Sequence, residues 1–220
     1  IAVALAFAGL FPFANHLYTY VSEPLRALLP EGSSMIATEV TSPFLTPFKL
    51  SLVLAVFVAM PVILAQVWGF IAPGLYKSER RIAVPLLASS VVLFYGGVAF
   101  AYYVVFPLLF GFFTTVGPGD IAVMTDINRY LDFVLKLFFA FGLAFEVPVA
   151  AVILILSGVV TADQLANNRS YVIVGCFVMG MLLTPPDVIS QTLLALPMWL
   201  LFEVGLIMGR VLSRGNLDDE

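Results

Sequence analysis

The sequence predicts an all-α integral membrane protein, and three observations support this fold class. Of its 220 residues, 61% are hydrophobic and only 11% are charged, whereas a soluble domain carries about 25% charged residues. The apolar residues form runs long enough to cross a bilayer as helices, which need about 20 residues each. These runs do not have the ten-residue alternating pattern of a transmembrane barrel. We therefore expect a bundle of membrane-spanning helices.

The apolar runs predict six spans in a single transmembrane domain over residues 1–214, followed by a cytoplasmic tail at 215–220. The spans are expected at about 1–14, 48–71, 82–113, 127–157, 171–184 and 188–208. The first run opens at Ile1 without an initiator Met, so we expect a native segment before it. The fifth run would be only about 21 Å long as a helix, which is short for a hydrocarbon core of about 30 Å.

A short charged loop between the second and third spans sets the predicted orientation. Lys77, Arg80 and Arg81 fall close together there, and Lys and Arg collect in cytoplasmic loops. The loop and both termini are therefore predicted inside. The long connection at 15–47 is expected outside, as a packed cap of short helices. One of these helices is predicted to begin at Ser22 with Pro24 in its first turn.

The composition excludes several classes of site. Cys176 is the only cysteine and His16 the only histidine, so an intrachain disulfide, most metal sites and most catalytic triads are ruled out. No pair of catalytic residue types lies on facing spans. We predict no enzyme activity, no metal or other cofactor and no nucleic-acid partner.

Charged residues inside the apolar runs need partners. Asp132 and Lys136 have the i,i+4 spacing of a pair on one helical face. Glu203 is expected to pair with Arg210 or with water. Glu146, just before Pro148, lies deeper, where an ionisable group costs about 2.5–3.5 kcal/mol on insertion scales.

The residues alone leave the environment of Glu146 open, because its carboxyl group needs a hydrogen-bonding partner, a water-filled cavity or a proton. It could make an internal hydrogen bond, for example to Gln191 or Thr184. It could instead carry protons.

Three long motifs, supported by two shorter ones, carry a resemblance to a known family. The long motifs are Phe70-Ile-Ala-Pro-Gly-Leu-Tyr-Lys-Ser-Glu-Arg-Arg81, Phe145-Glu-Val-Pro-Val149 and Gly180-Met-Leu-Leu-Thr-Pro-Pro-Asp187, and the shorter ones are Ser42-Pro-Phe-Leu-Thr-Pro47 and Ser190-Gln-Thr-Leu-Leu194. Over essentially its whole length the chain resembles TatC, the polytopic subunit of the twin-arginine protein translocase. Members of that family carry a cytoplasmic segment before the first span that helps to bind the signal peptide, and this segment is absent from the sequence.

The resemblance implies that Glu79 helps to read the arginine pair of a twin-arginine signal peptide. Guanidinium groups pair well with carboxylates, often bidentately. The remaining residues implied at this site are Phe70, Leu75, Tyr76 and Arg80. Spacing alone favours a simpler interpretation, a surface ion pair of Glu79 with Arg80 or Arg81, worth about 0–1 kcal/mol.

The resemblance also implies a docking site for single-span partner subunits of the TatA and TatB type. Its implied residues are Glu146, Met181, Leu182, Thr184 and Gln191. Periodicity alone would assign the last four to ordinary helix packing. A third group, Pro24, Phe44, Asp126 and Asp187, matches family positions in the rigid outer cap, and we expect these residues to be structural.

Two functions follow from these observations. The first is a receptor and scaffold that transports folded proteins across the bacterial cytoplasmic membrane, within a multimeric complex and without catalysis of its own. The second is a proton-coupled small-solute transporter that uses Glu146. The sequence has no internal repeat, which weakens the transporter, and its charged loop suits a peptide better than a solute. We therefore favour the receptor; a thylakoid location is less favoured than a bacterial membrane.

Overall fold

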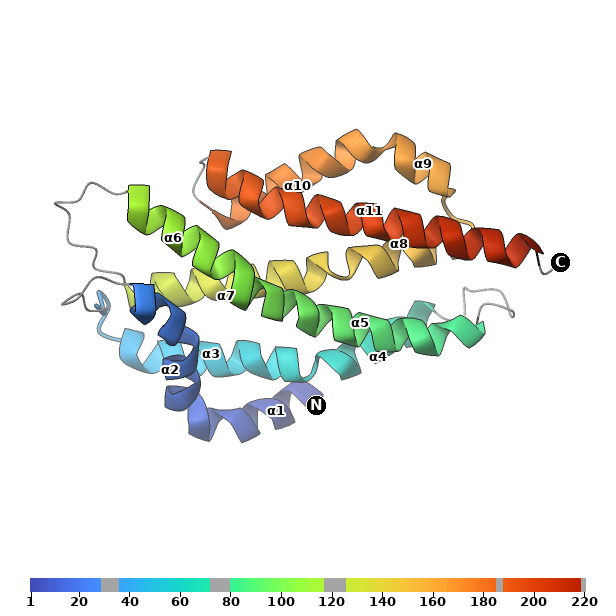
Figure 1. Cartoon of the computed structure of the whole chain (residues 1–220). Coiled ribbons are helices and arrows are strands. Elements are labelled where there is room, and N and C mark those ends of the chain that lie inside the picture. The colour runs from blue at the N-terminus through green and yellow to red at the C-terminus, as the bar shows by residue number, and fades with distance from the viewer. Residues whose placement is uncertain (29–35, 72–79, 117–125, 185–187, 219–220) are drawn as a thin grey trace. The chain divides into compact units, whose positions relative to one another are not determined.

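Helices are the only regular secondary structure in the described part of the chain (Figure 1). The computed structural model describes residues 1–28, 36–71, 80–116, 126–184 and 188–218; the side chains of 24–28, 70–71, 80–83, 113–116 and 214–218 are outside this description. Within these ranges there is no β-strand, only one isolated bridge between Ile36 and Asp126. The predicted all-α class is confirmed.

The helices follow the apolar runs of the sequence. In chain order they are α1 (Ala2–Leu10), the 3-10 turn η1 (Phe11–Phe13), α2 (Ala14–Leu28), α3 (Ser42–Val58), α4 (Met60–Ile71), α5 (Arg80–Phe100), the π-helical turn η3 (Ala101–Val105), α6 (Phe106–Val116), α7 (Ile127–Ala144), α8 (Val147–Leu156), α9 (Ala162–Asn167), α10 (Arg169–Leu183) and α11 (Val188–Asp218).

Four helical stretches among the described residues are long and apolar enough to cross a membrane. They are Ala2–Glu23, Val84–Phe112, Ile127–Leu156 and Val188–Ser213, and the bent pair of α3 and α4 makes a fifth. Helix α10, with 15 residues, is apolar but shorter. A count of six spans and their orientation stay predictions, as does a single domain over 1–214. Helix α11 continues to Asp218, so part of the predicted tail is helical.

Three prolines lie at interruptions of the long helical stretches. Pro61 lies in the first turn of α4, after a break that bends α3 and α4 by 46°. Pro148 likewise lies in the first turn of α8, after the break that ends α7. Pro107 directly follows the π-helical turn and the first residue of α6. Proline has no N–H to donate, so it is tolerated where a helix begins.

The chain folds into two compact units, and the first comprises Ile1–Val62 and Tyr102–Leu137. In it, α1 and α2 pack on α3, and α2 also contacts α6. Tyr130, buried on α7, donates a hydrogen bond of 2.9 Å to the carbonyl of Val21 on α2. This bond ties α2 to a helix more than 100 positions later in the chain.

The predicted helix start at Ser22 is wrong. Helix α2 runs through this position, and the Ser22 hydroxyl donates back to the carbonyl of Thr19 at 3.0 Å. Pro24 therefore lies inside α2 and leaves the carbonyl of Tyr20, four residues earlier, without its helical donor. The hydroxyl of Tyr102 donates to that carbonyl at 3.4 Å. A tyrosine from another segment thus compensates for the internal proline.

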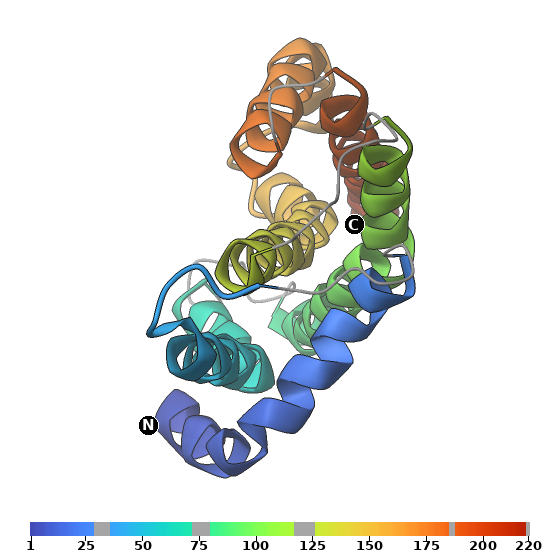
Figure 2. The same ribbon diagram turned by 90° about the vertical axis from the view of Figure 1, so that its left-hand side faces the viewer.

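The second unit comprises Ile63–Ala101 and Phe138–Glu220. Helix α11 packs along both α8 and α10, and α10 and α11 lie side by side in Figures 1 and 2. A core cluster joins α4, α5 and α8; its buried members are Trp68, Leu86, Val149, Val152 and Leu156.

Two glycines let helices of the second unit approach closely. A Cβ atom at Gly205 of α11 would lie 2.5 Å from the Cα atom of Pro148. A Cβ atom at Gly97 of α5 would lie 2.4 Å from the carbonyl oxygen of Phe141. Both obstacles are backbone atoms, which cannot turn aside, so only glycine fits this packing.

Candidate partner-binding and peptide-binding sites

The predicted signal-peptide site falls largely outside the described residues. Leu75, Tyr76 and Glu79 belong to that part of the chain. Phe70 lies near the end of α4 and Arg80 begins α5, but their side chains are not described. The structure therefore gives the helices on either side of the charged loop and leaves its peptide-binding role a prediction.

Glu146 lies at the break between α7 and α8, where it is the N-cap residue of α8. Its side chain is half-buried, and its Oε1 atom is buried without a hydrogen-bond partner among the described residues. Ser90 of α5 is the side-chain hydrogen-bonding partner of the carboxyl group. The indole N–H of Trp68 on α4 donates to the Ser90 oxygen at 3.3 Å. We call Trp68, Ser90 and Glu146 the Glu146 cluster.

Sequence reasoning missed Trp68 and Ser90. Both are buried. Both also lie in apolar runs, where one polar atom hardly changes the hydrophobic pattern of the sequence. A serine within a span is nevertheless a signal, because a buried hydroxyl in an apolar setting needs a partner. The side chain that the structure places beside the Glu146 carboxyl group, Ser90, thus differs from the two partners expected.

The two expected partners, Thr184 and Gln191, make their hydrogen bonds within the hairpin of α10 and α11. The Thr184 hydroxyl donates to the carbonyl of Gly180 at 2.9 Å, and the Gln191 amide donates to that of Phe177 at 2.8 Å. A Cβ atom at Gly180 would lie 3.2 Å from Gln191. The contacts of Gln191 join the end of α10 to the first turns of α11, whereas the hydrogen bond of Thr184 lies within the last turn of α10.

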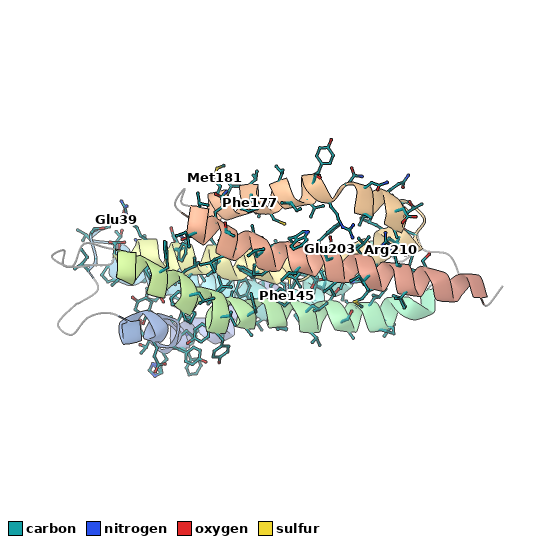
Figure 3. All side chains as sticks on the ribbon, turned by 45° about the horizontal axis from the view of Figure 1, so that its top comes forward. Glu39, Phe145, Phe177, Met181, Glu203 and Arg210 are labelled. Atoms are coloured by element: carbon teal, nitrogen blue, oxygen red, sulfur yellow. The ribbon has the colours of Figure 1, made fainter. Side chains whose placement is uncertain are left out.

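Met181 and Leu182 lie at the same end of the hairpin and are exposed, at 50% and 68%. In Figure 3 the Met181 side chain stands on the side of α10 that points away from α11. The structure therefore brings together four of the five predicted partner residues at this end, with two apolar side chains outward and two polar ones inward. Glu146 lies apart from them, at the break between α7 and α8.

The predicted ion pair between Glu203 and Arg210 is wrong. Glu203 pairs with Arg169 of α10 through two hydrogen bonds of 2.6 and 2.9 Å, and Arg210 pairs with Asp163 at 3.1 Å. Figure 3 shows Glu203 and Arg210 on the same helix, α11, and their partners Arg169 and Asp163 lie on α10 and α9. Two turns of helix separate Glu203 and Arg210 by about 10 Å, whereas Arg169 is brought directly opposite Glu203 by helix packing.

Asp132 pairs with Lys49 of α3 rather than with Lys136. A pair within one helix contributes only about 0.2–0.5 kcal/mol. The contact with Lys49 instead ties α7 to α3. Periodicity along one helix could not reveal this partner, because it comes from a segment more than 80 positions away.

Asp126 joins the start of α7 to the segment before α3. One carboxylate oxygen accepts from the backbone N–H of Arg129 at 3.0 Å, which caps the helix. The other accepts from the backbone N–H and the hydroxyl of Thr38, at 3.0 and 2.6 Å. These hydrogen bonds, with the Thr38 hydroxyl foremost, lower the pKa of Asp126 from 3.8 to about 2. This geometry suits the structural role predicted for Asp126.

The other three residues predicted for the outer cap give less evidence of a structural role than Asp126 does. Phe44 is exposed in the first turn of α3 and stacks on Phe48 with ring centroids 6.4 Å apart. Pro24 lies inside α2 as described above, and Asp187 is outside the described residues.

Comparison with known proteins gives the family. The family model described as "Sec-independent protein translocase protein (TatC)" matches residues 1–197. The chain belongs to the TatC family. It is 68% identical to the TatC protein of Azotobacter chroococcum over 94% of this chain and 82% of that protein. It is 58% identical to TatC of Escherichia coli K12 over 96% of this chain and 81% of that protein.

The fold agrees with that of a solved TatC structure. A crystal structure described as the twin-arginine translocase receptor TatC matches with a TM-score of 0.86 and 38% identity, covering 97% of this chain and 93% of that chain. TatC is a component of a protein translocase, so the protein is a multi-pass membrane protein of a transport system. The family resemblance predicted from the sequence motifs is confirmed.

Proposed function

We propose that this chain is the receptor and core scaffold of a twin-arginine translocase. It recognises twin-arginine signal peptides at the cytoplasmic face of a bacterial inner membrane. It also assembles single-span partners of the TatA and TatB type for transport of folded proteins. The signal-peptide residues are Glu79, Phe70, Leu75, Tyr76 and Arg80, and the partner-binding residues are Glu146, Met181, Leu182, Thr184 and Gln191.

The observation that carries the scaffold role is the unsatisfied oxygen of Glu146. A buried acceptor without a partner costs about 1–3 kcal/mol, and this one lies in a stretch of apolar helices. The Oε1 atom of Glu146 has no partner among the described residues. A polar side chain supplied by a second membrane helix would satisfy it.

An exposed apolar surface at the end of the α10–α11 hairpin also supports the scaffold role. Met181 and Leu182 offer an apolar surface, while Thr184 and Gln191 make their hydrogen bonds within the hairpin itself. This surface would therefore hold a partner helix by packing, and the rigid hairpin would keep that surface in place. We assign packing to Met181 and Leu182, positioning to Thr184 and Gln191, and polar recognition to Glu146.

Export of a folded reporter tests both halves of the proposal. In cells that lack their own TatC, the protein should export a fluorescent reporter carrying a twin-arginine signal. Glu79→Ala and Glu146→Ala should each lower export at least several-fold with normal amounts of protein in the membrane. Glu39→Ala, which removes an exposed carboxylate elsewhere, is the control and should leave export unchanged. Normal export by Glu79→Ala would refute the receptor role, and normal export by Glu146→Ala would refute the scaffold role.

A further inference from the structure

The hydrogen bonds of the Glu146 cluster have a defined direction. An indole N–H can only donate, so the Ser90 oxygen is the acceptor in its contact with Trp68. A serine hydroxyl carries one hydrogen, and here that hydrogen is free to be donated elsewhere. The side chain that Ser90 meets on its other side is the Glu146 carboxyl group. The chain of donors therefore runs from Trp68 through Ser90 to Glu146.

This direction distinguishes the two oxygens of Glu146. One oxygen takes the hydrogen of Ser90, and the other, Oε1, is buried without a partner among the described residues. The carboxyl group is thus held through one oxygen, and the other oxygen, Oε1, is left to bind another group. The anchor itself is rigid, because Trp68 is buried in the core cluster with Leu86 and Val152 and Ser90 is also buried.

We propose that Trp68 and Ser90 are positioning residues that reserve one oxygen of Glu146 and present Oε1 to a single polar side chain of a partner membrane helix. This rests on the proposed role of Glu146 in partner binding. The site takes one hydrogen-bonding side chain at membrane depth and discriminates against an apolar side chain in its place. Without the anchor, the carboxyl group could turn and satisfy itself on neighbouring atoms, and the discrimination would be lost.

Association with a synthetic helix in lipid vesicles tests the proposal. The probe is a single-span Leu/Ala helix with one Asn at its centre, and the reference is the same helix with Leu there. An Asn amide can both donate and accept, so it suits either protonation state of Glu146. Energy transfer between labelled protein and labelled helix gives the two affinities. The wild type should prefer the Asn helix by about threefold, the effect of an average hydrogen bond between membrane helices.

The variants separate positioning from general stability. Ser90→Ala and Trp68→Phe should bring the ratio of the affinities for the Asn and Leu helices close to one. The affinity for the Leu helix itself should stay unchanged. The chain offers two matched controls, Ser89→Ala and Trp199→Phe. The Ser89 hydroxyl donates to the carbonyl of Leu86 at 2.8 Å, and the indole N–H of Trp199 has no partner among the described residues. Both controls should keep the preference.

The outcomes distinguish this proposal from the one on which it rests. A preference that is lost in Glu146→Ala but kept in both Ser90→Ala and Trp68→Phe overturns the positioning role alone. Equal losses of affinity for the Asn and Leu helices would show that the two residues are merely structural, which also overturns it. A preference that survives in Glu146→Ala, or is missing from the wild type, removes the partner-binding role of Glu146 and the positioning role together.

Discussion

Single side chains in this protein stabilise it by joining segments that are far apart in the chain. Asp126 connects the start of α7 to Thr38, and Tyr130 connects α7 to α2. Arg169 and Glu203 connect α10 to α11. Most of these contacts lie near helix ends, where backbone groups lack helical partners. Substitutions at these positions should therefore lower stability without altering the apolar surfaces of the helices.

Asp126 should make stability depend on pH in the acid range. Its pKa is lowered from 3.8 to about 2, so the folded state favours the ionised carboxylate. This contribution is fully present above about pH 4 and is lost as the pH falls toward 2. The melting temperature of the wild type in detergent should therefore exceed that of Asp126→Asn by a constant margin from about pH 7 to 5, and the margin should shrink below about pH 4.

Asp163→Asn is the control for this measurement, because the Asp163 side chain is 88% exposed in its pair with Arg210. Its difference from the wild type should be small at neutral pH. A margin for Asp126→Asn that is unchanged down to about pH 2 would contradict the role of the ionised carboxylate.

The two-bond contact between Arg169 and Glu203 should require a guanidinium group. Lysine keeps the charge but cannot form the planar fork that engages both carboxylate oxygens. Arg169→Lys and Glu203→Gln should each lower the melting temperature. The double variant should lose less than the sum of the two single losses, because each single change already weakens the contact that the other change would weaken. Strict additivity in this double-mutant cycle would show that the two side chains do not stabilise each other.

At the scale of the helices, close packing depends on positions without a side chain. The approach of α11 to the start of α8 leaves no space for a Cβ atom at Gly205. The obstacle is the backbone of Pro148, whose conformation is itself restricted by its ring. The same helix pair forms the most extensive contact of the second unit, so a change here should affect the whole unit.

Gly205→Ala should destabilise the protein by about 1–3 kcal/mol, the usual effect of adding volume to a packed contact. Gly175→Ala on α10 is the matched control, since a Cβ atom there meets nothing within 4 Å. It should be neutral or slightly stabilising, because alanine has the higher helix propensity. Thermal unfolding of both variants in the same detergent measures the difference. Equal effects at the two positions would contradict the packing of α11 on α8.

The sequence predicted the apolar helices and some of their irregularities, and missed others for identifiable reasons. The break near Pro61 is consistent with the sequence, because proline cannot continue a helix unaided. The passage of α2 through Pro24 was missed, because the compensating hydroxyl of Tyr102 comes from a distant segment. Helix α9 was missed as well, although Thr161 and Gln164 form a capping box that the spacing could have revealed.

At the scale of the whole molecule, the long sequence motifs predicted the family. The spacing of individual charged residues did not predict which side chains pair between helices. The motif around Glu146 was one of those that carried the family resemblance, yet Trp68 and Ser90 beside Glu146 could be found only once the helices were packed. Sequence spacing describes one helix at a time, whereas the partners of Asp132, Glu146 and Glu203 all lie on other helices. Membership of a protein translocase follows from the family, whereas the partners of single side chains follow from the packing of the helices.

The receptor role is tested most directly by binding of signal peptides to the purified protein. Peptides with Arg-Arg and with Lys-Lys at the twin-arginine position should be compared on the wild type and on Glu79→Ala. We expect the wild type to bind the Arg-Arg peptide more tightly, because a carboxylate pairs bidentately with guanidinium groups and not with ammonium groups. Glu79→Ala should remove this difference. Equal binding of the two peptides to the wild type would contradict the proposed role of this protein as the signal-peptide receptor.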